Sequence, residues 1–149
     1  MTTTTTTHPN LANENDRVSR ADSSSRLAIV ERELSYLIIA AFFEVYNALG
    51  FGFLESVYAR AMEVALGRRG LLVQREVPVV FDGVEVGRHR LDMLVERRIV
   101  LEIKSTERLS DVPKRQLRNY LAATNLELGI ILHFGPKAEY HRVLYTKQV

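Results

Sequence analysis

The hydrophobic pattern at the start of the chain predicts two helices. Apolar residues recur at helical spacing from about Leu27 to Leu49, and Gly50 is a natural helix stop. After the bend Gly50-Phe51-Gly52, a second helix is predicted from about Leu54 to Arg69, closed by Gly70. The buried stripe of this second helix is expected to comprise Leu54, Val57, Tyr58, Ala61 and Ala65.

The pattern changes to short strand-like segments after the second helix. The expected strands are Leu72 to Phe81, Val84 to Arg88 after an Asp82-Gly83 turn, Arg90 to Val95 and Ile99 to Lys104. A third helix over "SDVPKRQLRNYLAAT", with Ser110 or Asp111 as N-cap, precedes two strands, "LELGIILHF" and "YHRVLYT". This order predicts an α/β (α+β) domain built on one sheet.

The first 26 residues differ in character from the rest. They are rich in Thr, Ser and Asn with few large apolar groups, so burial cannot offset the entropy of ordering them. We therefore expect a disordered tail over residues 1–26 and a single domain over residues 27–149. A chain of 149 residues, 46% hydrophobic and 26% charged, is long enough for one core.

Composition excludes several classes of protein. The absence of cysteine excludes a disulfide scaffold and a thiolate metal site, and it is compatible with the cytoplasm. The N-terminus lacks the features of a secretory signal, and Glu44 and Asn47 interrupt the most apolar stretch, so a soluble protein is expected. Net charge is only +2, although sixteen of the 20 basic residues are arginine, which favours bidentate contact with phosphate or carboxylate.

The strand "IVLEIKSTERL" carries two charges within an apolar run. Residues two apart share a strand face, so Glu102 and Lys104 are predicted to project side by side. One interpretation is a solvated surface ion pair, which predicts full exposure of both groups and a contribution of roughly 0–1 kcal/mol. The other is that this strand face lines a functional site.

Asp92 in the preceding strand bears on that choice. If Glu96, Arg97 and Arg98 all form the loop, Asp92 falls opposite Glu102 on the same face. A two-residue loop instead sends the two carboxylates to opposite faces. Facing carboxylates repel each other unless a cation lies between them, and hard oxygen ligands suit Mg²⁺ or Mn²⁺.

Two further groups of polar residues fit a site. Glu55 lies at the edge of the predicted stripe, where it either points into a cleft or complements the helix dipole. Gln116 and Tyr120, four apart, share one face of the third helix. With neighbouring basic residues they form either a mixed surface or a face that holds a phosphate backbone. Those neighbours are Lys114, Arg115 and Arg118.

The ordered set of motifs resembles a known family. Gly52-x-x-Glu55-x-x-Tyr58, Asp92, Glu102-x-Lys104 and Gln116-x-x-x-Tyr120 are similar to the GxxExxY proteins, a prokaryotic group in the PD-(D/E)XK nuclease-like superfamily. The resemblance covers Leu34 to Tyr145. It lacks the "PD" dipeptide, because Leu91 precedes Asp92.

The resemblance implies a fold and a role for each residue. The fold would be a restriction-endonuclease-like core, αβββαβ, with a mixed central sheet flanked by helices. By resemblance, Asp92, Glu102 and Glu55 would be metal ligands and Lys104 the catalytic lysine. Gln116 and Tyr120 would be the QxxxY element of the RecB-like branch.

These features lead to one hypothesis and one alternative. The hypothesis is a Mg²⁺- or Mn²⁺-dependent nuclease acting on nucleic acid, with DNA as the expected substrate and the Ile103 carbonyl as an additional ligand. The alternative is a non-catalytic module that binds nucleic acid or a protein partner and retains the fold.

Other uses of the residues are weaker. His89, His133 and His141 lack zinc spacing and are interpreted as surface or hydrogen-bonded core residues. An apolar face would suit either the core or a second subunit in a homodimer. This face comprises Leu37, Ile38, Ala41 and Val45.

Overall fold

The computed structural model describes the backbone of residues 14–75, 77–88 and 93–146, and the side chains from residue 31 onward apart from that of Arg88. The helices are α1 (Glu14–Leu49), α2 (Glu55–Arg68) and α3 (Val112–Thr124). The strands are β1 (Val73–Gln74), β2 (Pro78–Phe81), β3 (Val84–Arg88), β4 (Met93–Val95), β5 (Ile99–Lys104), β6 (Leu128–Phe134) and β7 (Ala138–Leu144).

The main sheet has five strands in the order β1-β4-β5-β6-β7. Only β5 and β6 run parallel among these pairs, because α3 carries the chain from the end of one to the start of the other. The remaining neighbours are antiparallel. The order α2, β1, β4, β5, α3, β6 is the predicted αβββαβ core, so the predicted α+β fold class is confirmed.

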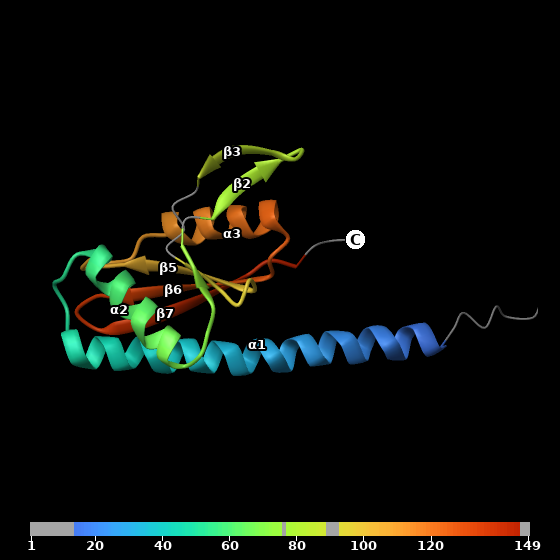
Figure 1. The fold of residues 1–149 in the computed structure, drawn as a ribbon, viewed down its shortest axis with the longest axis horizontal. Coiled ribbons are helices and arrows are strands. Elements are labelled where there is room, and N and C mark those ends of the chain that lie inside the picture. Colours follow the sequence, from blue (N-terminus) through green and yellow to red (C-terminus); the bar gives the residue numbers. More distant parts are fainter. Residues whose placement is uncertain (1–13, 76, 89–92, 147–149) are drawn as a thin grey trace, which may run out of the picture.

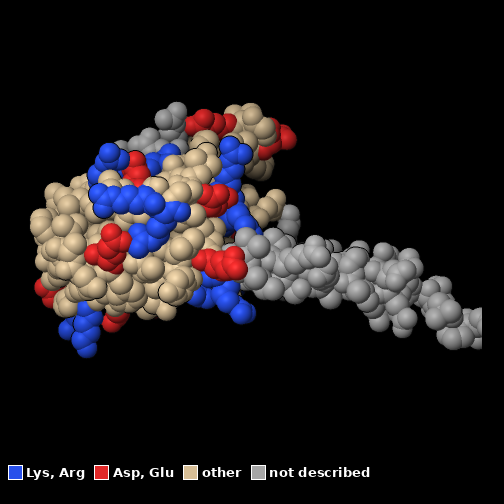
Figure 2. All heavy atoms as spheres, turned by 60° about the horizontal axis from the view of Figure 1, so that its bottom comes forward, with Lys and Arg blue, Asp and Glu red and all other residues tan. Residues whose placement is uncertain are grey.

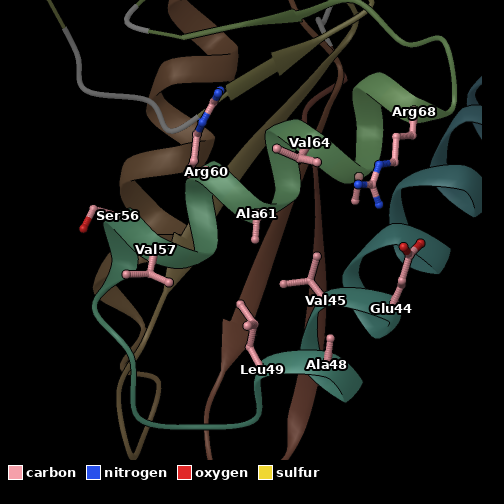
Figure 3. A pocket seen from close by; sticks show the side chains of 11 residues that line it. Glu44, Val45, Ala48, Leu49, Ser56, Val57, Arg60, Ala61, Val64 and Arg68 are labelled. Carbon is pink, nitrogen blue, oxygen red and sulfur yellow. The ribbon is translucent and has the colours of Figure 1, made fainter.

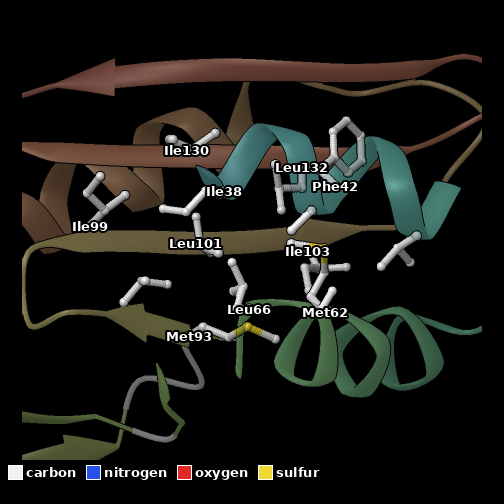
Figure 4. Close-up of a cluster of buried hydrophobic side chains, with 14 of the residues drawn as sticks. Ile38, Phe42, Met62, Leu66, Met93, Ile99, Leu101, Ile103, Ile130 and Leu132 are labelled. Atoms are coloured by element: carbon white, nitrogen blue, oxygen red, sulfur yellow. The ribbon is translucent and has the colours of Figure 1, made fainter. Parts of the chain in front are cut away.

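Helices cover both faces of this sheet (Figure 1). Alternate residues of β5 and β6, such as Leu101 and Ile130, pack against α1 and α2 in the larger hydrophobic cluster. In Figure 4, Phe42 of α1 lies beside Leu132 of β6, and Met62 of α2 lies beside Ile103 of β5. The intervening strand residues face α3 in a smaller cluster, which therefore makes the sheet a central layer buried on both sides.

The start of α1 differs from the prediction. The helix begins at Glu14, where composition predicted a disordered tail up to residue 26. Extending an existing helix by one residue costs much less than nucleating a new one, so a core helix can continue into a polar segment. The start of the domain at residue 27 remains a prediction, and residues 1–13 lie outside the described part.

The expected single sheet is also wrong in part. The segment predicted as one strand from Leu72 to Phe81 is divided into β1 and β2, and β2 pairs with β3 as a separate two-stranded sheet. The predicted turn is confirmed, since Asp82 and Gly83 both have positive φ (51° and 75°). In Figure 1 this hairpin lies on the far side of α3 from the main sheet.

The stripe predicted for α2 is partly wrong. Tyr58 and Ala65 are buried as expected, but Leu54 and Val57 are exposed. Apolar residues occupy adjacent faces of this helix, so spacing alone does not decide which face meets the sheet. The residues buried in α2 are Tyr58, Ala59, Met62, Ala65 and Leu66.

The apolar face of α1 is used for the core. Ile38, Ala41 and Val45 are buried within the same molecule, and Leu37 is half-buried. The face is therefore covered without a second subunit. Within the part of the chain that the structure describes, no helix has the combination of length and apolar character that crossing a membrane requires.

Candidate active site

The turn between β4 and β5 has the length that the site requires. Val95 pairs with Ile99 and Met93 with Leu101, so three residues, 96–98, form the loop. Glu96 and Arg97 adopt positive φ values of 53° and 54°. The Leu72 N–H donates to Glu96 Oε1 at 2.6 Å, which ties the turn to the start of β1.

Of the two loop lengths that the sequence left open, the three-residue loop is the one observed. It is the register that the sequence argument required for Asp92 to face Glu102. Asp92 itself lies outside the described residues, so its place opposite Glu102 stays a prediction.

Glu102 and Lys104 form a partly buried ion pair on β5. Lys104 Nζ lies 3.4 Å from Glu102 Oε1, on the sheet face that also carries α3. Glu102 is only 7% exposed, and the Lys104 side chain is 25% exposed. The surface-pair interpretation predicted full exposure of both groups and is therefore wrong. A carboxylate this buried is costly to keep unless it has partners, which is typical of a functional site.

Glu55 reaches the same end of β5 from the opposite layer. It is the first residue of α2, and its Oε1 accepts a hydrogen bond from the Ser105 N–H at 3.4 Å. Ser105 Oγ also donates to the Phe53 carbonyl at 2.6 Å. Two hydrogen bonds therefore join the start of α2 to the residue that follows Lys104. Of the two interpretations of Glu55, these contacts favour a place at a site over a dipole effect alone.

The spacing Gly52-x-x-Glu55-x-x-Tyr58 has a structural explanation. Gly52 has a φ of 117°, which other residues rarely adopt. The Tyr58 hydroxyl donates to the Gly50 carbonyl and accepts from the Phe53 N–H at 3.2 Å. The Tyr58 ring is stacked on Phe134, with centroids 4.1 Å apart. The motif thus fixes the loop that precedes Glu55.

Sequence reasoning missed part of this arrangement. Ser105 was not identified, although it directly follows the charged strand and contacts both Phe53 and Glu55. The sequence indicated Tyr58 only as part of the Gly-x-x-Glu-x-x-Tyr motif and as a buried residue, with no role for its hydroxyl. A hydroxyl one position beyond a charged strand was the only available signal for Ser105.

Gln116 and Tyr120 lie on one face of α3, as predicted, but their surroundings differ. Gln116 is exposed, whereas Tyr120 is only 4% exposed and belongs to the smaller cluster, where burial raises its pKa. Both line a cavity of about 270 Å³ together with Val79 of the β2–β3 hairpin. Arg115 and Arg118 are exposed and do not line it.

The donor chemistry at the end of β5 fits a hard divalent cation. Glu55 and Glu102 offer carboxylate oxygens, and Ile103, between Glu102 and Lys104, offers a backbone carbonyl; these are the donors that Mg²⁺ prefers. No group of three His, Cys, Asp or Glu suited to a metal occurs among the described residues, a set that leaves out Asp92. A three-carboxylate set therefore depends on Asp92.

A larger cavity lies away from these residues. It measures about 630 Å³ between α1 and α2, with Val45, Leu49 and Val64 in its lining (Figure 3). Glu44 and Arg68 lie at one end in this view. An apolar lining of this kind does not suit a phosphate backbone, and none of the candidate site residues contributes to it.

The surface over α1 and α2 is also not a basic face. In Figure 2, Lys and Arg side chains on this side of the molecule are interspersed with Asp and Glu. A nucleic-acid backbone is attracted by a concentration of positive charge. This side of the molecule shows no such concentration among the described residues.

Comparisons with known proteins bear on the family of this chain. No curated protein matches this chain. The solved structure described as "Crystal structure of SSO0001" covers 83% of this chain at 23% sequence identity, with a TM-score of 0.47, and this chain spans 63% of that one. The model of the PD-(D/E)XK nuclease superfamily matches residues 32–143, which is more than half of the chain. The chain therefore belongs to the PD-(D/E)XK nuclease superfamily.

Proposed function

We propose that this protein is a cytoplasmic, metal-dependent nuclease that hydrolyses phosphodiester bonds of DNA. We further propose that it belongs to the GxxExxY group and to the RecB-like branch of the superfamily. The observation that carries the proposal is the buried Glu102 beside Lys104, at the strand end that Glu55 also reaches. Superfamily membership supports the reaction class.

The carboxylates would hold the cation. Glu102, Glu55, Asp92 and the Ile103 carbonyl are the proposed ligands, with Mg²⁺ or Mn²⁺ as the ion. A bound divalent cation supplies a nucleophile near neutral pH and offsets negative charge on the phosphate. Glu102 lies on β5, a buried strand of the central sheet. The packing around this strand holds its carboxylate in place before substrate arrives.

Lys104 has a separate role. Its ammonium group lies on the same strand face as Glu102, and a quarter of the side chain is exposed, so it can approach a substrate oxygen. We propose that it orients the attacking water and stabilises the charge that develops on the phosphate. The ion pair with Glu102 holds the ammonium group at this position.

The face of α3 would bind the substrate backbone. Arg115 and Arg118 are exposed cations, and Gln116 is an exposed hydrogen-bonding group. Tyr120 is buried under the β2–β3 hairpin, so its proposed role is to support the position of Gln116 at their shared cavity.

The proposal is tested by incubating the purified protein with labelled single- and double-stranded DNA and RNA in Mg²⁺, Mn²⁺ or EDTA. We expect cleavage of DNA that requires a divalent ion and that Glu102→Gln abolishes. The matched control is Glu33→Gln, which removes an exposed carboxylate from α1 and should cut like the wild type. Cleavage by Glu102→Gln at the wild-type rate would overturn the proposal. Binding without cleavage in every metal would instead establish the non-catalytic binding module.

A further inference from the structure

A second polar cavity lies next to the proposed catalytic residues. Its volume is about 390 Å³. Its walls come from the segment after β5, the first turn of α3, the end of β6 and the start of β7. We call it the His133 pocket; it is lined by Glu107, Arg108, Leu109, Lys114, His133, Pro136, Lys137, Glu139 and His141.

Three cations from three different segments surround this pocket. Arg108 follows β5, Lys114 lies in the first turn of α3, and Lys137 lies in the turn between β6 and β7. Among the described residues, no carboxylate lies within ion-pair distance of any of the three. Glu139 approaches His141 instead, with Glu139 Oε2 3.9 Å from His141 Nε2. Cations that converge without such a partner favour binding of an anion.

The deepest polar group in the lining is His133. It is only 4% exposed, and its Nε2–H donates to the Thr106 carbonyl at 2.7 Å. Its Nδ1 has no hydrogen-bond partner among the described residues. A buried ring nitrogen without a partner is unusual in a folded protein, because leaving it unsatisfied costs free energy. With Nε2 protonated, Nδ1 is an acceptor and does not bind the oxygens of an anion, so the three cations are the groups that would bind one.

The electrostatics of the neighbouring histidine agree. The pKa of His141 lies below its ordinary value because burial and the positive charge of Lys114 disfavour the imidazolium, while Glu139 acts in the opposite sense. The side chains that face His141 therefore give a net positive environment despite the carboxylates in the lining.

Strand register fixes where the pocket lies relative to the catalytic residues. Lys104 of β5 is paired with His133 of β6, and His133 with Glu139 of β7. The pocket therefore lies beside the end of β5, one strand away from Lys104 and the residue that follows it, Ser105. A group bound there would lie next to the proposed catalytic residues.

We propose that the His133 pocket binds a phosphate group of the nucleic-acid substrate that neighbours the scissile bond. This inference rests on the proposed nuclease function and assigns to it a subsite built from Arg108, Lys114 and Lys137. The phosphate is either internal to the strand or terminal, and both present the same anionic oxygens to the cations.

The first test uses inorganic phosphate and requires no catalysis. The imidazole NMR signals of His133 and His141, assigned with His→Gln variants, are followed as sodium phosphate is added at constant ionic strength. We expect both signals to shift in a saturable way in the wild type and in Arg60→Gln, which loses an exposed arginine of α2 outside the pocket. The double variant Lys114→Gln/Lys137→Gln should not shift. Absence of saturable shifts in the wild type overturns the proposal.

The second test measures DNA binding in EDTA, so that cleavage is suppressed. Short DNA strands with a 5′-phosphate, a 3′-phosphate or hydroxyl ends are titrated with the same proteins. We expect the double variant to bind about tenfold more weakly. Each lost phosphate contact should reduce the slope of log affinity against log salt by about 1. A merely structural role for the lysines would leave that slope unchanged, which would overturn the proposal.

The three DNA strands, which differ only at their ends, distinguish an internal phosphate from a terminal one. A loss of affinity for all three strands identifies an internal phosphate, and a loss confined to one phosphorylated strand identifies a terminal one. The two proposals fail in distinguishable ways, since phosphate binding without any cleavage would refute the nuclease and leave only an anion-binding pocket.

Discussion

Ser105 donates its backbone N–H to the Glu55 carboxylate at 3.4 Å, which joins the start of α2 to the end of β5. The two residues come from different layers, because α2 packs on the sheet face opposite α3. A carboxylate on a helix is thereby brought to the end of the strand that carries Glu102 and Lys104.

This contact allows the position of Glu55 to be separated from its charge. In Glu55→Gln the amide oxygen can still accept from Ser105, but the negative charge is lost. We expect the cleavage rate to fall by at least about tenfold and Mn²⁺ affinity to weaken by a similar factor, since one coordinating charge is missing. Glu63→Gln, a partly exposed position further along α2, is the control. Unchanged Mn²⁺ affinity in calorimetry would remove Glu55 from the ligand set.

Lys104→Ala should act on turnover rather than on metal binding. Loss of a positioned cation typically costs about 10²–10³ in rate when it stabilises transition-state charge. Because Lys104 also pairs with Glu102, its removal should leave Mn²⁺ affinity equal to or greater than that of the wild type. Single-turnover cleavage and calorimetric titration separate the two quantities. A variant that loses metal binding and cleaves normally at saturating metal would refute this division of roles.

Tyr58→Phe removes one hydroxyl and keeps the ring. The ring should stay stacked on Phe134, while the hydrogen bonds to Gly50 and Phe53 are lost. We expect stability to fall by about 1 kcal/mol in urea unfolding. Cleavage should fall further than that loss explains, because the loop before Glu55 is loosened. The control is Tyr36→Phe, an exposed tyrosine of α1, which should change neither. Wild-type activity in the folded Tyr58 variant would show that the hydroxyl does not position Glu55.

Gly129 marks a close approach of α3 to the sheet. A Cβ at this position of β6 would lie 2.7 Å from a Leu117 side-chain carbon, so Gly129→Ala should destabilise the fold by about 1–3 kcal/mol. Gly67 in α2 has open space around it, and Gly67→Ala should stabilise by roughly 0.5–1 kcal/mol. Chemical unfolding of the two variants checks both signs. Equal stability of both variants would contradict the packing of α3 on β6.

The titration of His141 gives a pH-dependent prediction. Its pKa in the folded protein should lie below 6.5, through burial first and Lys114 second, and His133 acts in the same sense. Lys114→Gln should raise the pKa, whereas Glu139→Gln should lower it further, as followed by NMR. A depressed pKa favours the neutral ring, so the stability it contributes is complete above 6.5 and is lost as pH falls through the folded pKa. A His141 pKa at or above 6.5 would contradict this environment.

Much of the fold was predictable because periodicity reports burial directly. The run from Ile99 to Lys104 is strand β5 with the predicted bounds, and its three-residue turn follows from the pairing of Val95 with Ile99. The separation of β2 and β3 from the main sheet was not predictable. A strand's sequence shows which face is apolar but does not show whether its neighbour is the main sheet or a lone hairpin.

Part of the site could also be predicted from the sequence, and part could not. Side-by-side placement of Glu102 and Lys104 follows from strand geometry, and the structure confirms it. Tyr120 belongs to a cluster against which Val79 of the hairpin packs, 41 positions away, and helical spacing cannot reveal this. The contacts of Ser105 with Phe53 and Glu55 likewise arise from packing between layers.

The separate β2–β3 sheet has a consequence for how this architecture can vary. The strands β1 and β4 pair with each other in the main sheet, although β2 and β3 come between them in the sequence. The segment between β1 and β4 therefore does not interrupt the main sheet. A change in the length or sequence of this segment would alter the hairpin beside α3. It would leave the pairing of β5, which carries Glu102 and Lys104, unchanged. Variation in this segment can therefore change the surface beside α3 without altering the position of Glu102 and Lys104.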